Sequence, residues 1–476
     1  MDQQAVLQEI SRWSIEAKDE DTEKYFYYFD DIKALETGYK NYVIGRKGTG
    51  KTAIAEYLHQ KDDFNRFSSL LSFKNFPFNF LYEHNDKDYN RPNQYITIWT
   101  YVIYHYICSM MSKNEFVTSR CSQEFKSHFD ADVHGALSRS LKKITSSSYN
   151  LSFLGTGGGY EQGAELGKFD LVRGTDTLRQ FVIDNIDESE YFVIFDELDE
   201  DYRDVLHPDR KDGYFELLIS LFKACQIVRS DLSQSGAKVR PIVFLRDDIF
   251  DLCRDVDKNK WLDRSVRLDW DAARLRSLVS FRLSRAIDPE APAASPNVWS
   301  AVFSASTISH GHLDKRKADT FRYLTSRTFL RPRDIISIIR ECARVADSQG
   351  KSRIGNDDIK EASKAHSAYL RREVIDEMFP VLDDVAEILG VLSKIRKQIF
   401  SRKEFNDRYR EYVNRSRVKQ VLTASQILQL LYHFNVIGNI TKGNHRVFSY
   451  DSDAKVLNMD ENFCVHNGLI HSLDII

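Results

Sequence analysis

The sequence predicts an α/β fold: a parallel sheet with flanking helices, followed by a helical region and a compact C-terminal module. Two apolar runs, residues 191–195 and 240–245, have the length and composition of strands buried on both faces. Helical segments alternate with these runs, which is typical of a parallel, doubly wound sheet. The third observation is a glycine-rich loop at residues 45–52, between a short β-rich run and a helix.

Bulk properties are those of an ordinary globular protein. The chain has 476 residues, a net charge of −3 and 42% hydrophobic residues, so it can bury a core in each of several domains. Its six cysteines form no CxxC pair, which favours a reduced cytoplasmic protein over a disulfide framework or zinc site. No secretory signal is visible. The most apolar stretch, residues 95–111, is short for a bilayer span, so we expect a buried helix and no membrane attachment.

Four regions are expected along the chain. A helical lead-in should precede a core in which residues 41–44 and 70–73 are further strand candidates. The core should contain an insertion of aromatic helices and a stretch rich in glycine and serine at 146–167, whose composition favours an open loop. The expected boundaries are 1–40 for the lead-in, 41–270 for the core with its insertion at about 77–167, 271–380 for a helical lid and 381–476 for the C-terminal module.

The glycine-rich loop fits the pattern GxxxxGK[ST]. Its glycines let successive backbone N–H groups converge on phosphate oxygens, and the helix beginning near Lys51 adds the positive end of its dipole. Lys51 is expected to reach the β- and γ-phosphates of ATP, and the Thr52 hydroxyl to bind Mg²⁺. The predicted nucleotide-binding residues are Gly45, Arg46, Lys47, Gly48, Thr49, Gly50, Lys51, Thr52 and Ala53.

Two acidic residues follow the apolar run 191–195. Asp196 lies where that strand should end, at the sheet edge where ligands bind, and is expected to hold Mg²⁺ with Thr52. Glu197 comes next, and because side chains alternate along a strand it can face the γ-phosphate and polarise the attacking water. An acidic cluster such as 196–201 is, on its own, usually a solvated loop; its position after a buried strand favours ATP hydrolysis.

These motifs resemble those of AAA+ and STAND-type ATPases of the additional-strand class. That group includes origin-recognition initiators, KAP-type NTPases and bacterial P-loop ATPases found near phage-defence genes. The resemblance rests on residues 42–52 and 195–197 and extends over roughly residues 35–345. It implies a parallel-sheet P-loop NTPase core with a helical lid, ATP and Mg²⁺ as ligands, and a homo-oligomer.

The resemblance also implies two sensor arginines. Arg246 follows the strand 240–245 and corresponds to sensor 1, which contacts the γ-phosphate; an ion pair with Asp247 or Asp248 is the alternative. Arg333 follows Pro332 at the start of an apolar helix and corresponds to sensor 2; a plain helix start is the alternative. The glycine usual before such a Pro-Arg step is replaced by residues 330–331.

The segment 261–270 resembles the one that carries the trans-acting arginine finger in AAA+ proteins. Arg264 or Arg267 would then complete the site of a neighbouring copy, which requires oligomerisation. Both can equally be ordinary surface arginines. The distance from Thr52 to Asp196 is long for a minimal AAA+ core, so the insertion between them is expected to contact a partner or regulate the site.

The C-terminal module is predicted to be a winged helix. Ser401 and Glu404 fit a capping box at the start of its second helix. Three helices are followed by a β-hairpin, at residues 381–398, 401–413, 423–434 and 436–450.

Basic residues are concentrated in this module. Residues 390–446 contain twelve Lys and Arg against three acids, a local balance of +9. Such a patch is typical of a nucleic-acid footprint, but winged helices in STAND proteins also serve as protein-docking switches, and both readings remain open. The candidate contacts to duplex DNA or another nucleic acid are Arg402, Arg408, Arg415, Arg417, Lys442 and Arg446.

Three functions are compatible with these features. The first is an ATP-hydrolysing switch that controls a separately encoded effector in bacterial antiphage defence or signalling. The second is a DNA-binding ATPase of the initiator or loader type. The third, a nucleotide-binding scaffold with little turnover, is disfavoured by Glu197. Because the chain carries no nuclease, protease or TIR-like constellation, any toxic activity would come from a partner.

Overall fold

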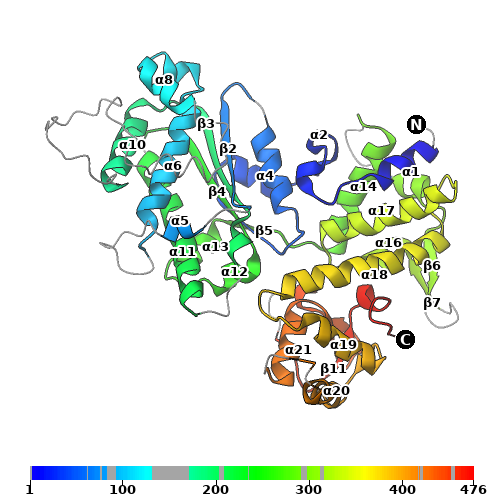
Figure 1. Cartoon of the computed structure of the whole chain (residues 1–476). Coiled ribbons are helices and arrows are strands. Elements are labelled where there is room, and N and C mark those ends of the chain that lie inside the picture. The colour runs from blue at the N-terminus through cyan, green and yellow to red at the C-terminus, as the bar shows by residue number, and fades with distance from the viewer. Residues whose placement is uncertain are drawn as a thin grey trace. The chain divides into compact units, whose positions relative to one another are not determined.

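The computed structural model forms two compact units, one of Tyr28–Leu268 and one of Met1–Tyr27 with Asp269–Ile476 (Figure 1). Within the part of the chain that the structure describes, no helix combines the length and hydropathy that a bilayer span requires. The described residues are 3–61, 63–74, 78–82, 93–130, 171–202, 208–233, 235–290, 297–310, 316–415, 417–418, 422–451 and 456–475.

A five-stranded parallel sheet forms the centre of the first unit. The strand order is β2-β3-β4-β1-β5, so β4 lies between the strand before the glycine-rich loop and the strand before Asp196. Because all strands run in one direction, the residues that follow them gather at one edge. The strands are β1 (Tyr42–Ile44), β2 (Arg66–Ser72), β3 (Glu190–Asp196), β4 (Lys238–Leu245) and β5 (Ser265–Arg267).

Helices cover both faces of this sheet (Figure 1). α4 packs against β2, β3 and β4, and α6 packs against β2 and β3 and against α10 and α11. Alternate residues of β3 face the two layers: Tyr191, Val193 and Phe195 join the aromatic core around α6. The helices are α3 (Asp30–Glu36), α4 (Lys51–Gln60), α5 (Asn79–Tyr82), α6 (Ile96–Met111), α7 (Glu115–Thr118), α8 (Gln123–Asp130), α10 (Leu171–Asn185), η3 (Leu198–Asp201), α11 (Pro208–Leu232), α12 (Asp247–Leu252) and α13 (Lys258–Asp263).

The most apolar stretch of the sequence is a buried helix, as predicted. Trp99 of α6 is fully buried and donates its indole N–H to the Leu217 carbonyl at 2.9 Å, so its polar atom is satisfied inside the core. The predicted loop rich in glycine and serine, 146–167, lies outside the described residues.

The second unit begins with the N-terminus of the chain. α1 packs against α14, α15 and α17. The Arg282 guanidinium lies 4.7 Å from the ring centres of both Trp13 and Tyr25 and forms an ion pair with Glu20 at 2.7 Å. Residues up to Tyr27 therefore belong with the helices that follow the core. The elements are α1 (Gln3–Ser11), η1 (Ala17–Asp19), α2 (Thr22–Tyr25), α14 (Ala272–Ile287), α15 (Val298–Val302), β6 (Thr307–His310), β7 (Arg316–Asp319), α16 (Thr320–Thr325), α17 (Pro332–Ser348) and α18 (Asn356–Met378).

The turn into α17 has a backbone conformation typical of glycine, although no glycine occupies it. Leu330 has a φ of +50°, in the left-handed region that L residues rarely adopt. Two hydrogen bonds hold the turn, because the fully buried Asp334 carboxylate accepts from the Phe329 amide at 3.0 Å and from the Arg331 Nε at 3.0 Å. Hydrogen bonds to a buried carboxylate thus stabilise this turn, at the place where the family that the sequence resembles usually has a glycine.

The C-terminal module has the predicted three helices and hairpin, with two strands that the sequence did not indicate. Its antiparallel sheet has the order β10-β9-β11-β8, and β8 and β11 are the additions. The capping box of Ser401 and Glu404 is present at the start of α20. The elements are α19 (Val385–Ile395), β8 (Ile399–Phe400), α20 (Arg402–Asn414), α21 (Ala424–His433), β9 (Ile437–Ile440), β10 (Arg446–Val447), η5 (Ser449–Asp451), β11 (Asn462–Val465) and η6 (Asn467–Leu469).

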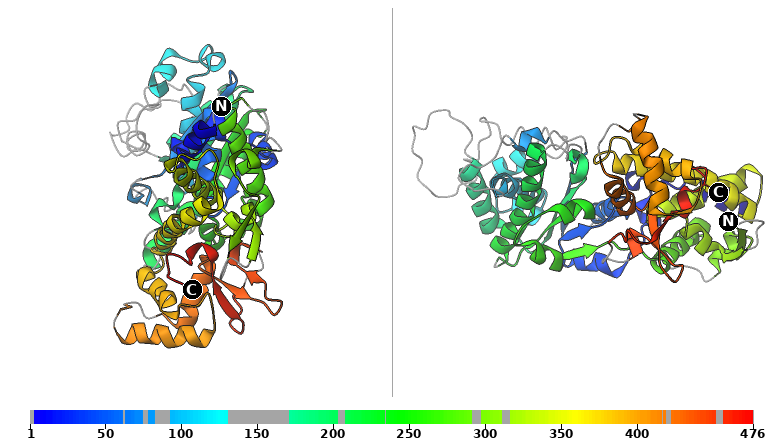
Figure 2. Two further views of the ribbon diagram at one scale, coloured as in Figure 1. Left: turned by 90° about the vertical axis from the view of Figure 1, so that its right-hand side faces the viewer. Right: turned by 90° about the horizontal axis from the view of Figure 1, so that it is seen from below.

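The end of the chain packs against α18, as the views of Figure 2 also show. Gly468 lies so close to the Arg327 carbonyl and the Leu370 side chain that a Cβ would collide with both. His466 is buried, accepts the Gly468 amide at Nδ1 (3.1 Å) and contacts the Tyr450 hydroxyl through Nε2 (3.0 Å). The acceptor role of Nδ1 requires the neutral ring.

His466 should therefore make stability depend on pH. Burial lowers its pKa in the folded protein to about 3, whereas the unfolded side chain titrates near 6.5. Below pH 6.5 only the unfolded state gains the proton, so the free energy of unfolding should fall as pH decreases, by up to about 2 kcal/mol at pH 5; above pH 6.5 the contribution is constant.

Urea denaturation at pH 7 and pH 5 measures this loss. His466→Asn keeps an acceptor for the Gly468 amide but does not titrate, so it should reduce the difference between the two pH values. His433→Asn, at an exposed histidine, is the matched control and should leave the difference unchanged. Equal pH dependence in wild type and His466→Asn would contradict the assignment.

Candidate functional site

The glycine-rich loop connects β1 to α4 at the carboxyl edge of the sheet. Gly50 is the N-cap of α4 with a φ of +96°, a conformation that glycine adopts readily. At Gly45 space is the constraint, because a Cβ there would lie 2.7 Å from the Thr49 Oγ1 and 3.0 Å from the Leu268 Cβ. The loop thus keeps the backbone shape that its glycines predict.

The Lys51 ammonium lies inside the loop. Its Nζ donates to the Gly45 carbonyl at 2.8 Å and to the Arg46 carbonyl at 3.0 Å. Burial lowers the Lys51 pKa, an effect partly offset by Asp199 and Asp247. Neutral carbonyl oxygens therefore hold the ammonium at the position where phosphate oxygens would bind. This arrangement fits a cation whose ligand is an anion.

Thr52 and Asp196 form the candidate metal site. The Asp196 side chain is 3% exposed, and burial raises its pKa to about 6, while hydrogen bonds from the Thr52 hydroxyl and the Glu197 amide act in the opposite direction. A hydroxyl and a carboxylate side by side are hard oxygen ligands of the kind that Mg²⁺ binds together with phosphate oxygens. The residues present therefore fit the metal, and its charge would relieve the cost of burying Asp196.

Glu197 has an unusual backbone. Its φ of 61° and ψ of 32° lie in the left-handed region, which costs a non-glycine residue roughly 1–3 kcal/mol and is found mostly at functional sites. The Ser72 hydroxyl donates a hydrogen bond to the Glu197 carboxylate. Ser72 ends β2 in register with Asp196, so the neighbouring strand brings this hydroxyl to the site.

Ser72 is not among the residues predicted from the sequence. The available signal was its place at the end of a strand candidate, since such residues meet at the carboxyl edge. Which strand lies beside β3 cannot be read from the local sequence.

Arg246 lies at the end of β4, beside the strand that precedes the loop. Its guanidinium contacts both carboxylate oxygens of Asp248, at 3.0 and 2.6 Å, and approaches Asp199 at 3.6 Å. Of the two interpretations of Arg246, the ion pair is the one that the structure contains. The sensor role then requires the guanidinium to exchange Asp248 for a phosphate.

Asp247 was predicted only as a partner of Arg246, and the structure gives it a different environment. Burial raises its pKa, and Asp248 adds to this effect, while the positive charges of Lys51 and Arg46 oppose it. Asp247 is thus a carboxylate close to the glycine-rich loop.

The two finger candidates lie at opposite ends of β5. Arg267 is exposed and pairs in register with Ile44, so it lies at the edge of the glycine-rich loop. Arg264 precedes β5, at the other edge of the sheet, and lines a pocket there.

Arg333 belongs to the second unit. It lies in the first turn of α17 and approaches Glu16 at 3.4 Å and Glu373 at 3.8 Å. The glycine-rich loop belongs to the other unit. Its sensor role stays a prediction.

The basic candidate residues of the C-terminal module differ in the contacts that their side chains make. Arg408 and Arg415 both pair with Glu411, at 3.0 and 2.8 Å. Arg417 lies 5.5 Å from the Tyr412 ring centre and is exposed. The exposed side chains thus lie on and just after α20.

Three further candidates lie nearer α21 and the hairpin. Arg402 donates to the Ser425 Oγ at 2.9 Å, and Lys442 is exposed at the hairpin turn. Arg446 instead donates to Asn467 at 2.6 Å and Gln398 at 3.1 Å, so it also ties β10 to neighbouring segments.

Sequence comparisons relate parts of this chain to known proteins. Residues 273–375 match a family described as the FunZ-associated C-terminal helical domain, which here spans α14 to most of α18. Over 445 residues the chain is 23% identical to the "Putative transposon gamma-delta 80.3 kDa protein" of Escherichia coli (strain K12). That alignment covers 88% of this chain but 60% of the relative, so the chain matches only part of that protein.

Solved structures with some similarity include origin-recognition proteins. The ORC2 protein of Aeropyrum pernix, in ADPNP–ADP complexes, is 12% identical with a TM-score of 0.41 and alignments covering 93% of this chain and 90% of that one. CDC6P from Pyrobaculum aerophilum is 11% identical, with a TM-score of 0.31 and coverage of 93% and 89%. Drosophila ORC bound to DNA is 11% identical, with a TM-score of 0.28 and coverage of 98% and 93%. With TM-scores this low, the similarity carries no further weight; the P-loop core is defined by its own strands and loop.

Proposed function

We propose that this chain binds ATP with Mg²⁺, hydrolyses the nucleotide and acts as a nucleotide-dependent switch. The observation that carries the proposal is the meeting of four groups at one sheet edge: the glycine-rich loop with Lys51, the Thr52–Asp196 pair, Glu197 and Arg246. The loop and Thr52 follow β1, whereas Asp196 and Glu197 lie at the end of β3. Arg246 follows β4, so three strand ends supply these groups, and their proximity is a property of the fold and not of a single loop.

Each group has one task in the proposed reaction. The loop amides and Lys51 bind the phosphates, and Glu197 accepts a proton from the attacking water while Ser72 orients its carboxylate. Mg²⁺ held by Thr52 and Asp196 would neutralise charge on the phosphates. Arg246 leaves Asp248 to contact the γ-phosphate, so the loss of that phosphate returns it to the ion pair.

We assign the core to the AAA+ and STAND-like group on the sequence resemblance and the position of β4 between β1 and β3. In this assignment Arg333 reports the nucleotide state to the helical unit, and Arg264 or Arg267 acts on a neighbouring copy in a homo-oligomer. The cellular role we propose is control of a partner effector in a cytoplasmic bacterial antiphage or signalling assembly.

A DNA-binding initiator or loader is the second candidate function. It is favoured by the exposed basic side chains on and after α20, while α21 presents the uncharged Gln426 and Gln429 to solvent. Basic residues that contact phosphates set affinity, and amide side chains in a groove can read bases.

Lys51→Ala tests the phosphate-binding role. Loss of the cationic clamp should lower ATP affinity at least about 100-fold, since a buried triphosphate would lose its closest counter-charge. Calorimetric titration with ATP–Mg²⁺ measures this. Lys238→Ala, at the opposite edge of the sheet, should bind ATP like wild type, and retained affinity in Lys51→Ala would refute the site.

Glu197→Gln tests hydrolysis separately from binding. It should keep ATP affinity, because the Lys51 and Thr52–Asp196 contacts persist, and lower kcat by about 10²–10⁴-fold. Ser72→Ala should lower kcat by a smaller factor at unchanged affinity, and Ser72→Thr, which keeps the hydroxyl, should restore it. Near-normal turnover in Glu197→Gln would identify another base.

The salt dependence of duplex binding tests the second function. Six phosphate contacts should give a slope of roughly −5 in log K against log salt, and Arg415→Glu with Arg417→Glu should reduce its magnitude by about 2. Arg276→Glu, on α14, should leave it unchanged. Weak binding that is insensitive to the paired reversal would favour a protein-docking role.

A further inference from the structure

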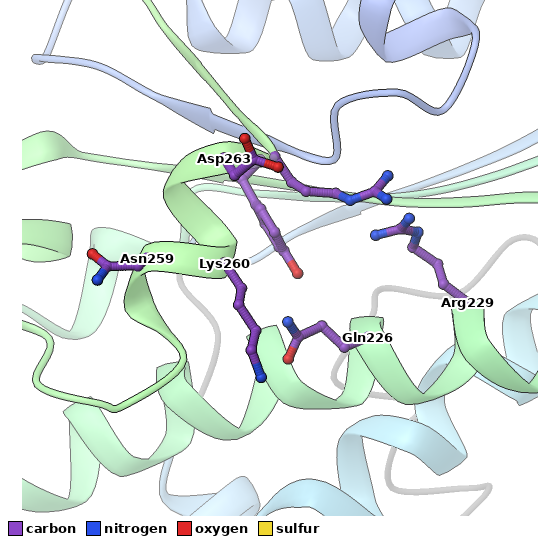
Figure 3. A pocket seen from close by; sticks show the side chains of 7 residues that line it. Gln226, Arg229, Asn259, Lys260 and Asp263 are labelled. Atoms are coloured by element: carbon purple, nitrogen blue, oxygen red, sulfur yellow. The ribbon is translucent and has the colours of Figure 1, made fainter.

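A pocket of about 480 Å³ opens at the amino-terminal edge of the sheet, away from the glycine-rich loop (Figure 3). Tyr42, the first residue of β1, forms part of its wall. The other lining residues come from α11, from α13 and from the residue after α13; they are Gln226, Arg229, Asn259, Lys260, Asp263 and Arg264.

The lining is rich in positive charge, because it contains Arg229, Lys260 and Arg264. Among the described residues, the half-buried Arg229 guanidinium has neither a hydrogen bond nor an ion pair. Arg264 donates to the Tyr39 carbonyl at 3.4 Å, and Lys260 pairs with Asp257 at 2.6 Å. Among the lining residues that the structure describes, Asp263 is the one acid, so the two arginines outnumber it.

The two arginines also act on each other. Burial lowers the pKa of Arg229, and the positive charge of Arg264 lowers it further. Both influence the Tyr42 hydroxyl, so their charges converge on one wall of the pocket. Like charges held together in a half-buried site are unfavourable unless an anion joins them.

Rigid elements hold this arrangement in place. The Tyr42 ring stacks on Phe222 with centroids 4.6 Å apart, and its hydroxyl donates to the Phe222 carbonyl at 3.3 Å. The buried Trp261 packs on the same Phe222 at 5.0 Å, which ties α13 to α11. These contacts fix α11, α13 and β1 relative to one another, which reduces the order lost on binding.

We propose that this pocket binds a phosphoryl group through Arg229 and Arg264. Guanidinium groups present N–H donors in a planar fork that matches phosphate oxygens. The volume is in the range of small-molecule sites and far exceeds one carboxylate side chain, and the amides of Gln226 and Asn259 offer donors and acceptors to the rest of a ligand. Figure 3 shows Arg229 and Gln226 extending from α11 into the space that Lys260 borders.

Two sources can supply this chemistry. One is a free phosphorylated molecule, which is independent of the function proposed above. The other is the nucleotide on a second copy of the chain, which rests on that function and would make Arg229 a partner of the finger candidate Arg264. In either case the site is separate from the chain's own loop, because Tyr42 and Gly45 lie at opposite ends of the three-residue β1.

Titration with inorganic pyrophosphate tests the pocket. The full chain is first saturated with ADP and Mg²⁺, so that its own loop is filled, and ionic strength is held constant with chloride. Wild type should bind pyrophosphate saturably, Arg229→Ala should bind at least about tenfold more weakly, and Arg229→Lys should fall between them, since it keeps the charge but loses the fork.

Arg254→Ala is the matched control, since Arg254 is an exposed arginine of the same unit outside the pocket lining. It should bind pyrophosphate like wild type. Thermal unfolding without pyrophosphate guards against misfolding: Arg229→Ala should be at least as stable as wild type, because it removes a repulsion. Unchanged pyrophosphate binding in a folded Arg229→Ala would overturn the proposal.

Turnover per chain at increasing protein concentration separates the sources. A rise in wild type that is absent in Arg229→Ala, at equal ATP affinity, identifies the phosphate as a neighbour's nucleotide. Pyrophosphate binding without that rise identifies a free ligand. If neither depends on Arg229, the pocket is not a phosphoryl site. Failure of Lys51→Ala to weaken ATP binding would refute the P-loop function alone. The pyrophosphate experiment compares wild type with variants of Arg229, so its result does not depend on Lys51.

Discussion

The short strand β1 is the constraint on which the rest of the core depends. Its three residues are almost fully buried and pair in parallel with β4 on one side and β5 on the other. Because Ile44 is level with Leu245 and with Arg267, the next residues of three strands reach the same edge. A shift of register by one residue would move the glycine-rich loop away from Arg246 and turn every β1 side chain to the other face.

The charged groups at this edge have polar partners within the protein. Lys51 is satisfied by loop carbonyls, Arg246 by Asp248, and Asp196 by a hydroxyl and an amide. Each of these contacts is of a kind that a phosphate or metal ion can replace. Binding therefore exchanges one set of partners for another, so the net gain is smaller than the new contacts alone suggest.

The sequence predicted what depends on local chemistry. The loop glycines, the apolar runs of β3 and β4 and the capping box of Ser401 each carry a signal within a few residues, and the structure contains all of them. The pair β6–β7 was missed because its second strand, Arg316–Asp319, is polar and lacks an apolar alternation.

The features that the sequence did not predict depend on contacts between residues distant in sequence. The place of the N-terminal residues follows from Arg282, more than 250 positions after the aromatic rings it contacts. Likewise, the Ser72–Glu197 contact requires β2 and β3 to be neighbours. The left-handed backbone of Glu197 could not be predicted, because the residue is not a glycine.

The P-loop unit is a continuous stretch of chain inserted into another folding unit, and this has a consequence for synthesis on the ribosome. The apolar face of α1 (Val6, Leu7 and Ile10) leaves the ribosome before the inserted unit, but its main partner α17 starts at Pro332. At about 5–20 residues per second, that face waits roughly 20–60 s, while the inserted unit can already complete its sheet. During this interval α1 lacks its main partner and exposes apolar residues, the kind of segment that chaperones bind.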